Sequence, residues 1–221
     1  GDVAACSTAG AMNIRNGQWN AELCEVAGID MTILPHLHNP QDNIGTVTES
    51  AAQRTGFSAG TAVYAGIGDA GATTLASGVS HPGQYNINIG TSGWIATVSP
   101  EPFTDKPGAA NLAFGVEEGF VNAVPFLNAG DVHKWVTGVF SDGDYAEAHQ
   151  LIETSKPGSN GVLCLPYLVG ERFPVMNPNI RGAYVGLDPD TTKADMMRAA
   201  LEGVAFSIRQ GMESFDAKPK I

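Results

Sequence analysis

One aspartate stands where an apolar stretch of the chain runs into glycines. Residues 61–68, with the sequence Thr-Ala-Val-Tyr-Ala-Gly-Ile-Gly, lead directly into Asp69, and small residues follow. A carboxylate at the end of a strand can face the crevice in which α/β proteins bind small molecules. Phosphoryl transfer to an alcohol needs such a group to orient the hydroxyl and to accept its proton. Asp69 is thus a candidate general base. A cap on a helix that begins at Ala70 is the alternative, and the two roles are compatible.

A second glycine-rich turn follows at Gly90-Thr91-Ser92-Gly93. Glycines let the backbone approach an oxygen closely, and the hydroxyls of Thr91 and Ser92 add donors, so the turn suits a phosphate. A tight hairpin is the other interpretation. Trp94 stands where a Gly-x-Ser-x-Gly nucleophile elbow needs its last glycine, which argues against an α/β-hydrolase. The sequence also lacks the P-loop motif. A base followed by a phosphate turn indicates phosphoryl transfer to an alcohol.

The composition limits the classes of partner. The chain has 221 residues, 43% of them hydrophobic, which is enough for one large or two small domains with real cores and argues against disorder. Its net charge is −11 with only 12 Lys and Arg. So few cations argue against binding to nucleic acid or to anionic membranes. A nucleotide remains compatible, because backbone N–H groups and Mg²⁺ can hold phosphates.

Cysteine and histidine patterns do not predict a protein-bound metal. The three cysteines are scattered, so we expect neither disulfides nor a zinc site, but reduced, buried thiols in a cytoplasmic protein. His36 and His38 would face the same side of a strand, as metal ligands do, but no third ligand has suitable spacing. No apolar run approaches the length of a membrane span, and no signal peptide is visible.

A loop at residues 170–174, Gly-Glu-Arg-Phe-Pro, places opposite charges side by side. An internal ion pair between Glu171 and Arg172 would fix this loop in a structural role. A place in a cleft wall is the functional alternative.

The first part of the chain alternates helical and extended patterns. Residues 19–27 have helical spacing, and Gly28 suits the position after a helix. Residues 61–65 predict a buried strand, and the small residues after Asp69 predict a tightly packed helix. Short extended pieces are expected at residues 33–35 and 45–47.

Glycine-rich residues 78–83 mark the expected boundary between two units, and the pattern after them becomes β and then helical. Short apolar stretches separated by turn residues predict a β meander. Thr192 opens a long helix, and Asp195 three residues later forms a weak capping box. The expected meander strands are 84–89, 94–98, 112–116 and 120–124, the further helices 131–140 and 145–153, and the further buried strands 161–166 and 182–187.

Several stretches in this order resemble the FGGY carbohydrate kinases, the family of xylulokinase, gluconokinase and glycerol kinase. No stretch is specific alone, but the ordered set is, and it covers nearly the whole chain. The stretches are 13–23 with Trp19, 34–35, 66–70, 89–93, 129–135, 165–174 with Arg181 and Gly182, and 198–206.

This resemblance implies an α/β, actin-like (ribonuclease H-like) ATPase fold with mixed sheets flanked by helices. Residues 1–78 would be the C-terminal part of the sugar-binding N-terminal domain. Residues 79–221 would begin the nucleotide-binding C-terminal domain. In the family, two such domains close on ATP and sugar in the cleft between them.

The resemblance also implies roles for individual residues. Asp69 matches the base that accepts the proton of the attacking sugar hydroxyl. Ala70 follows that base, and Trp94 matches an aromatic that lines the polyol pocket in glycerol kinase, so both are expected to contact the sugar. The positions expected to contact the nucleotide phosphates are Gly90, Thr91, Ser92 and Gly130.

Some family motifs are missing from the sequence. It lacks the N-terminal Asp-x-Gly-Thr phosphate motif, the sugar-contacting residues upstream and the C-terminal Gly-Gly-Gly-Ala adenosine motif. We therefore expect the middle of a kinase of roughly twice this length, without kinase activity on its own. Ala70 follows the expected base, at the position where the resemblance implies Gln in glycerol kinases and Asn in xylulokinases. This difference disfavours glycerol as the substrate and weakens the case for xylulose.

We expect ATP-dependent phosphorylation of a sugar hydroxyl with ATP and Mg²⁺ as cofactors, and favour a ketopentose such as D-xylulose. Gluconate or another sugar acid is the next candidate. A silent sugar- or nucleotide-binding module, or an actin-like ATPase that acts on no sugar, are the alternatives of other classes. The expected partners are a small sugar and ATP, with neither nucleic acid nor membrane, and a homodimer is compatible with the resemblance.

Overall fold

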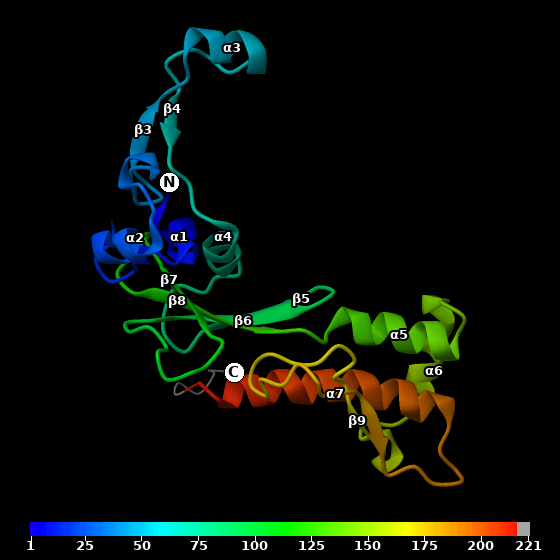
Figure 1. Ribbon diagram of the computed structural model, residues 1–221. Helices are drawn as coiled ribbons and strands as arrows, with labels where there is room; N and C mark the ends of the chain where they lie inside the picture. Colours follow the sequence, from blue (N-terminus) through cyan, green and yellow to red (C-terminus); the bar gives the residue numbers. More distant parts are fainter. Residues whose placement is uncertain (216–221) are drawn as a thin grey trace. The chain divides into compact units, whose positions relative to one another are not determined.

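The computed structural model describes residues 1–215 and divides into two compact units (Figure 1). Unit 1 holds residues 1–86, 96–103 and 110–122. Unit 2 holds residues 87–95, 104–109 and the chain from 123 onward. The expected domain boundary at residues 78–83 stays a prediction.

Unit 1 begins with short elements around a small core. Asn20 caps helix α2, since its Oδ1 accepts the N–H of Leu23 at 3.1 Å, so this helix starts two residues later than predicted. Gly28 ends it in the left-handed conformation, with φ of 68°, as predicted. Ile33 lies in a 3₁₀ turn rather than in the expected extended piece. The elements are α1 (Val3–Cys6), η1 (Ser7–Ala9), β1 (Met12–Asn13), β2 (Gln18–Trp19), α2 (Ala21–Ala27) and η2 (Met31–Ile33). Val3, Met12 and Ala113 form the core.

An antiparallel ribbon of β3 (Asn43–Thr46) and β4 (Ala62–Tyr64) follows, joined through helix α3 (Glu49–Thr55) at its end (Figure 1). The strand predicted at 61–65 therefore exists, but its predicted burial is wrong because all three β4 residues are exposed. Among the described residues β4 pairs only with β3. A continuous apolar run suggests coverage on both faces, which a two-stranded ribbon does not provide.

The largest sheet has the strand order β5-β6-β8-β7. The predicted meander is wrong in this respect, because β8 rather than β7 lies beside β6. The prediction took consecutive strands as neighbours, whereas a long connection between β6 and β7 leaves β7 at the edge. The strands are β5 (Tyr85–Ile89), β6 (Gly93–Ser99), β7 (Ala110–Ala113) and β8 (Phe120–Phe126).

Unit 2 packs three helices and a two-stranded sheet around one core. The predicted helices at 131–140 and 145–153 are confirmed as α5 (Gly130–Phe140) and α6 (Tyr145–Thr154). Strands β9 (Leu163–Leu165) and β10 (Ala183–Val185) pair antiparallel, with Cys164 opposite Tyr184. Only Cys164 of β9 is buried, so the predicted burial of this strand is wrong for its two leucines. The core residues are Val132, Val136, Ala148, Val162, Cys164, Met197, Ala199, Ala200 and Val204.

Helix α7 (Lys193–Glu213) begins with the predicted capping box. The Asp195 carboxylate, 2% exposed, accepts hydrogen bonds from Ser155 Oγ at 2.6 Å and from Asn160 Nδ2 at 2.7 Å. It also accepts the N–H of Thr192 at 2.9 Å. These hydrogen bonds, led by the one from Ser155, lower the pKa of Asp195 to about 2. One carboxylate therefore caps α7 and joins it to the segment after α6.

Candidate functional site

Asp69 is the first residue of helix α4 (Asp69–Ala76), and its side chain is exposed. Gly68 is the N-cap, so the alternative in which Asp69 itself caps the helix is wrong by one position. Oδ1 of Asp69 accepts the N–H of Ala70 at 2.8 Å. A carboxylate in the first turn is stabilised by the helix dipole. Within the described residues no hydrogen bond is made to its other oxygen, Oδ2, and the residue is exposed.

Close packing of α1 against Gly68 positions Asp69. The Asp2 carboxylate accepts the N–H of Ala5 at 3.0 Å and that of Gly68 at 3.3 Å. A Cβ atom at position 68 would lie 3.0 Å from the Cβ of Ala5 and 3.1 Å from its Cα. Glycine is therefore needed before the aspartate, because any side chain there would push the start of α4 away from α1.

A small cavity in unit 1 opens beside Asp69. Its volume is about 130 Å³, below the roughly 300 Å³ at which pockets for drug-sized ligands begin. It can hold a hydroxyl-bearing group, and only one side of a sugar. It is lined by Ala4, Ala5, Thr8, Gly68, Asp69, Ala70, Gly71 and Leu112.

The predicted phosphate-binding residues come together in unit 2. The N–H of Gly130 donates to the carbonyl of Gly90 at 2.8 Å, and that of Asp131 donates to the carbonyl of Thr91 at 3.2 Å. The side chains of Thr91 and Ser92 are exposed. No side chain caps the N-terminus of α5. The turn after β5 therefore packs directly against the start of α5: its carbonyls occupy the first two amides of the helix, and the exposed hydroxyls of Thr91 and Ser92 are the donors left beside it.

Contact between the turn and the helix requires glycine at position 130. A Cβ atom there would lie 2.5 Å from the carbonyl oxygen of Gly90. Trp94 lies in β6, half-buried, and its indole Nε1 is buried without a hydrogen-bond partner among the described residues. Asp69 and Ala70 belong to unit 1, whereas Gly90, Thr91, Ser92, Trp94 and Gly130 belong to unit 2.

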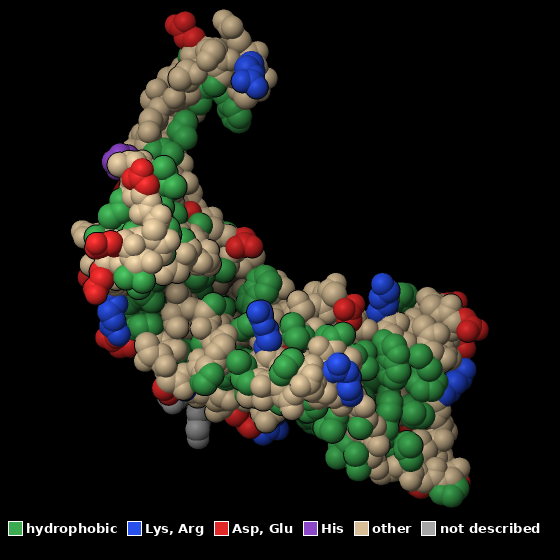
Figure 2. Space-filling view, in the orientation of Figure 1, with side chains coloured by type: hydrophobic (Ala, Val, Ile, Leu, Met, Phe, Trp, Pro, Cys, Tyr) green, Lys and Arg blue, Asp and Glu red, His purple; other side chains and the backbone are tan. Residues whose placement is uncertain are grey.

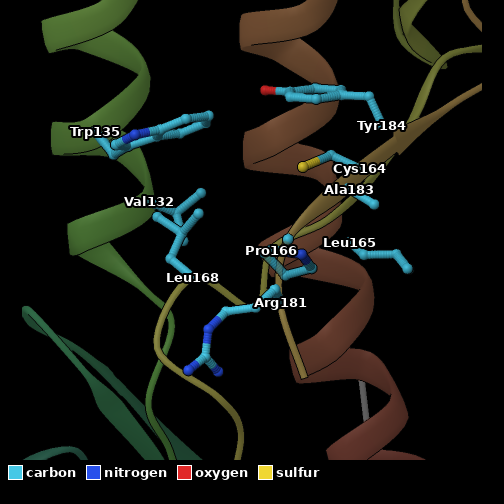
Figure 3. Close-up of a pocket in the computed structure, with 10 residues that line it drawn as sticks. Val132, Trp135, Cys164, Leu165, Pro166, Leu168, Arg181, Ala183 and Tyr184 are labelled. Atoms are coloured by element: carbon cyan, nitrogen blue, oxygen red, sulfur yellow. The ribbon is translucent and has the colours of Figure 1, made fainter. Parts of the chain in front are cut away.

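A second cavity, of about 270 Å³, lies between α5 and the β9–β10 sheet (Figure 3). The sequence does not predict this cavity, since its walls come from distant segments. Burial raises the pKa of the Cys164 thiol, which keeps it protonated and a poor nucleophile. Burial also raises the pKa of Tyr184, whose hydroxyl donates to the carbonyl of Met196 at 3.1 Å. The walls of the cavity are mostly apolar, and Arg181 and Tyr184 are the polar residues among them.

Sequence comparisons decide the family. Residues 85–221 match the C-terminal domain of the FGGY family of carbohydrate kinases, and residues 1–76 match its N-terminal domain. The chain belongs to the FGGY family of carbohydrate kinases. The predicted resemblance is thereby confirmed.

Similar relatives of this FGGY chain include two Bacillus subtilis enzymes. A xylulose kinase is 31% identical over 206 residues, which are 92% of this chain and 41% of the relative. A gluconokinase is 30% identical over 218 residues, which are 94% of this chain and 42% of the relative. The chain therefore spans about two fifths of the length of these curated relatives.

Solved structures confirm the predicted fold class. Ligand-bound xylulose kinase from Lactobacillus acidophilus superposes with a TM-score of 0.88 at 26% identity and covers 99% of this chain and 45% of the other. Gluconate kinase from the same organism gives 0.84 at 25% identity, over 95% of this chain and 43% of the other. The FGGY chain has the actin-like fold and contains parts of two domains.

Three further features concern metal ligands, membrane spans and cysteines. In the described part of the chain, no three His, Cys, Asp or Glu residues form a group that could hold a metal ion. Within residues 1–215, no helix has both the length and the apolar character to span a bilayer. The three cysteines are free, and Cys6 is only half-buried, contrary to the expected burial.

Exposed hydrophobic side chains occur in several parts of the chain, the four short strands β3, β4, β9 and β10 among them. Figure 2 shows such side chains at the surface over α5 and β9. They are also frequent on the β3–β4 ribbon. The exposed residues on the strands are Ile44, Val63, Tyr64, Leu163, Leu165 and Val185.

Proposed function

We propose that the full-length protein transfers the γ-phosphoryl group of ATP to a sugar hydroxyl, most readily that of a ketopentose such as D-xylulose. The observation that carries this proposal is the exposed carboxylate of Asp69 at the start of α4, in a chain of the FGGY carbohydrate kinase family.

The chemistry assigned to Asp69 follows from its hydrogen bonding. One oxygen is occupied by the N–H of Ala70 and fixes the carboxylate. The other oxygen takes the hydroxyl proton while the sugar oxygen bonds to the γ-phosphorus and the bond to ADP breaks. We assign sugar contacts to Ala70 and Trp94 as well.

The turn at Gly90 and the start of α5 are proposed to hold the phosphates of ATP. Supporting this assignment, Gly130 and Asp131 donate to the carbonyls of the turn, which keeps the exposed hydroxyl side chains of Thr91 and Ser92 beside the start of α5. The binding residues are Gly90, Thr91, Ser92 and Gly130. ATP enters as its Mg²⁺ complex, in which the ion neutralises phosphate charge.

A sugar acid such as gluconate is the second candidate substrate. A specific observation supports it, because a gluconokinase is 30% identical to this chain, close to the 31% of the xylulose kinase from the same organism. Ala70 also departs from the residue that xylulokinases are expected to have after the base. A ketopentose and an aldonate differ in charge, so a substrate panel separates the two.

The test is an ADP-release assay on the full-length protein with ketopentoses, polyols and sugar acids. The comparison variants are Asp69→Asn, which keeps an oxygen for the Ala70 N–H, and Glu22→Gln, which makes the same acid-to-amide change in the exposed first turn of α2. We expect turnover on one sugar, a loss of about 10²–10⁴-fold in Asp69→Asn, and no change in Glu22→Gln.

Other outcomes, taken together with a measurement of sugar binding, would indicate a different function or a different base. Sugar binding without turnover in the wild type would indicate a silent binding module. ATP turnover that does not depend on sugar would indicate an actin-like ATPase. Unchanged turnover in Asp69→Asn would remove Asp69 from the chemistry.

A further inference from the structure

We propose that Glu171 is a positioning residue for the nucleotide-phosphate site. From the loop at residues 170–174 it fixes Leu127 and Asn128, which lead directly into Gly130 and helix α5. The inference deepens the proposed function and rests on it, since it concerns the phosphate-binding role given to Gly130.

The Glu171 carboxylate is buried and accepts three hydrogen bonds. Its side chain is only 2% exposed. Oε1 accepts the N–H of Leu127 at 2.8 Å and the N–H of Arg172 at 2.7 Å. Oε2 accepts Nδ2 of Asn128 at 2.9 Å. A buried charge is costly unless it is fully hydrogen-bonded, so each of these donors is needed.

Asn128 forms the other half of this buried pair and is 1% exposed. Its Nδ2 also donates to the carbonyl of Gly170 at 2.6 Å, while its Oδ1 accepts the N–H of Leu168 at 2.8 Å. The Asn128 amide cannot flip, because its hydrogen bonds to Gly170, Glu171 and Leu168 would then all be lost. The orientation of Asn128 therefore requires an acceptor, and only an acceptor, at the position of Oε2.

The Glu171 loop is itself well anchored. Glu171 and Asn177 exchange both backbone hydrogen bonds, each at 2.9 Å. The N–H of Phe173 donates to the carbonyl of Pro125, near the end of strand β8, at 3.3 Å. The loop thus offers a fixed point against which the chain between β8 and α5 is held.

The Glu171 loop acts on the phosphate site through the backbone of Ala129 and Gly130, the two residues that follow Asn128. Asn128 is followed by Ala129, which makes no side-chain cap, and then by Gly130, which donates to Gly90 at 2.8 Å. The start of α5 is therefore held by Glu171 and Asn128 on the chain before it and by the Gly90 turn at its first amide. Loss of the hydrogen bonds from Leu127 and Asn128 to Glu171 would let Gly130 shift relative to the turn at Gly90.

The test uses Glu171→Gln in the full-length protein, with Glu202→Gln as the matched control. In the first variant a new NH₂ group faces the NH₂ of Asn128, so one contact becomes repulsive. Glu202, half-buried on α7, likewise fastens a loop of unit 2, accepting the N–H of Gly158 at 3.0 Å and Oγ of Ser159 at 2.8 Å. The probes are ADP affinity by titration calorimetry and amide hydrogen exchange over residues 127–131.

We expect Glu171→Gln to weaken ADP binding and raise the KM for ATP by about tenfold or more, to leave the KM for sugar unchanged, and to speed exchange at residues 127–131. Glu202→Gln should alter neither readout even where it lowers the melting temperature. Where Glu171→Gln does not fold, Glu171→Asp, which keeps the charge but is one methylene shorter, is measured by the same probes.

Two contrary results have distinct meanings. Normal ADP affinity and normal exchange in the Glu171 variants of an active wild type would overturn the positioning role alone. A wild type that neither binds ADP nor turns over sugar would overturn the proposed function and this inference with it.

Discussion

Two carboxylates in this chain make opposite use of the same chemical group. Asp69 is exposed, uses one oxygen for a neighbouring backbone N–H and keeps the other free. Glu171 is buried, and both of its oxygens accept hydrogen bonds from backbone and amide donors. Proton transfer needs a carboxylate oxygen that can still accept a proton, whereas a positioning residue needs oxygens that are held by hydrogen bonds. The contrast therefore separates a residue suited to chemistry from one suited to holding a loop, although both follow glycine in the sequence.

The largest effect on the free energy of unfolding is expected at the buried, hydrogen-bonded carboxylate of Glu171. Glu171→Gln should lower the free energy of unfolding by about 2–3 kcal/mol, because a buried donor is left facing another donor. Asp69→Asn should change it by less than about 0.5 kcal/mol, since the residue is exposed. Urea unfolding of both variants measures the difference. Equal destabilisation would remove the distinction between the two sites.

A second buried carboxylate extends the comparison to pH. Hydrogen bonds lower the pKa of Asp195 in the folded chain to about 2, against about 3.9 in an unfolded chain. Its contribution is therefore present above about pH 4 and is lost as the pH falls towards 2. We expect the loss to reach about 2 kcal/mol.

Urea unfolding between pH 2 and 6 tests this expectation, with Asp195→Asn as the comparison. The variant should be less stable at pH 6 and should show a flatter dependence on acid. An equally steep acid dependence in Asp195→Asn would assign that dependence to other carboxylates.

The backbone surface at the phosphate turn is expected to be sensitive to a single methyl group. Gly130→Ala places a Cβ atom 2.5 Å from the carbonyl oxygen of Gly90, so the turn and α5 must separate. We expect ADP affinity to fall by about tenfold. ADP titration of the full-length variant gives the measurement, and unaltered affinity would exclude close contact at Gly130 as a requirement for binding.

The smallest expected effect comes from a control in the same helix. Gly138 also lies in α5, but a Cβ atom there would meet nothing within 4 Å. Gly138→Ala should stabilise the chain by about 0.5–1 kcal/mol through helix propensity and leave ADP affinity unchanged. Thermal unfolding and ADP titration check this. A loss of ADP affinity would mean that any change in α5 disturbs the site.

Features set by local residues could be predicted from the sequence. Helix α7 begins as expected because Thr192 and Asp195 exchange their capping bonds within four residues. The end of helix α2 at Gly28 is also set locally, because the chain leaves the helix through a left-handed residue and glycine adopts that conformation without strain. The turn at Gly90 also carries its own signature of glycine and hydroxyl residues.

Features set by distant residues could not be predicted. The partner of Glu171 is Asn128, 43 residues earlier, and nothing in either segment indicates the other. Burial of β4 was inferred from its apolar run, but burial depends on which elements cover the strand. The start of α4 at Asp69 rather than Ala70 depends on the contact between Gly68 and α1, which sequence spacing does not contain.

One measurement addresses the contrast between the two carboxylates directly: kcat at saturating sugar and ATP, together with the dissociation constant for ADP, in wild type, Asp69→Asn and Glu171→Gln. The account predicts that Asp69→Asn loses about 10²–10⁴-fold in kcat while keeping its ADP affinity. Glu171→Gln should lose ADP affinity and keep most of its kcat. An Asp69→Asn variant with normal kcat, or one whose only defect is in ADP binding, would contradict the assignment of the chemistry to Asp69.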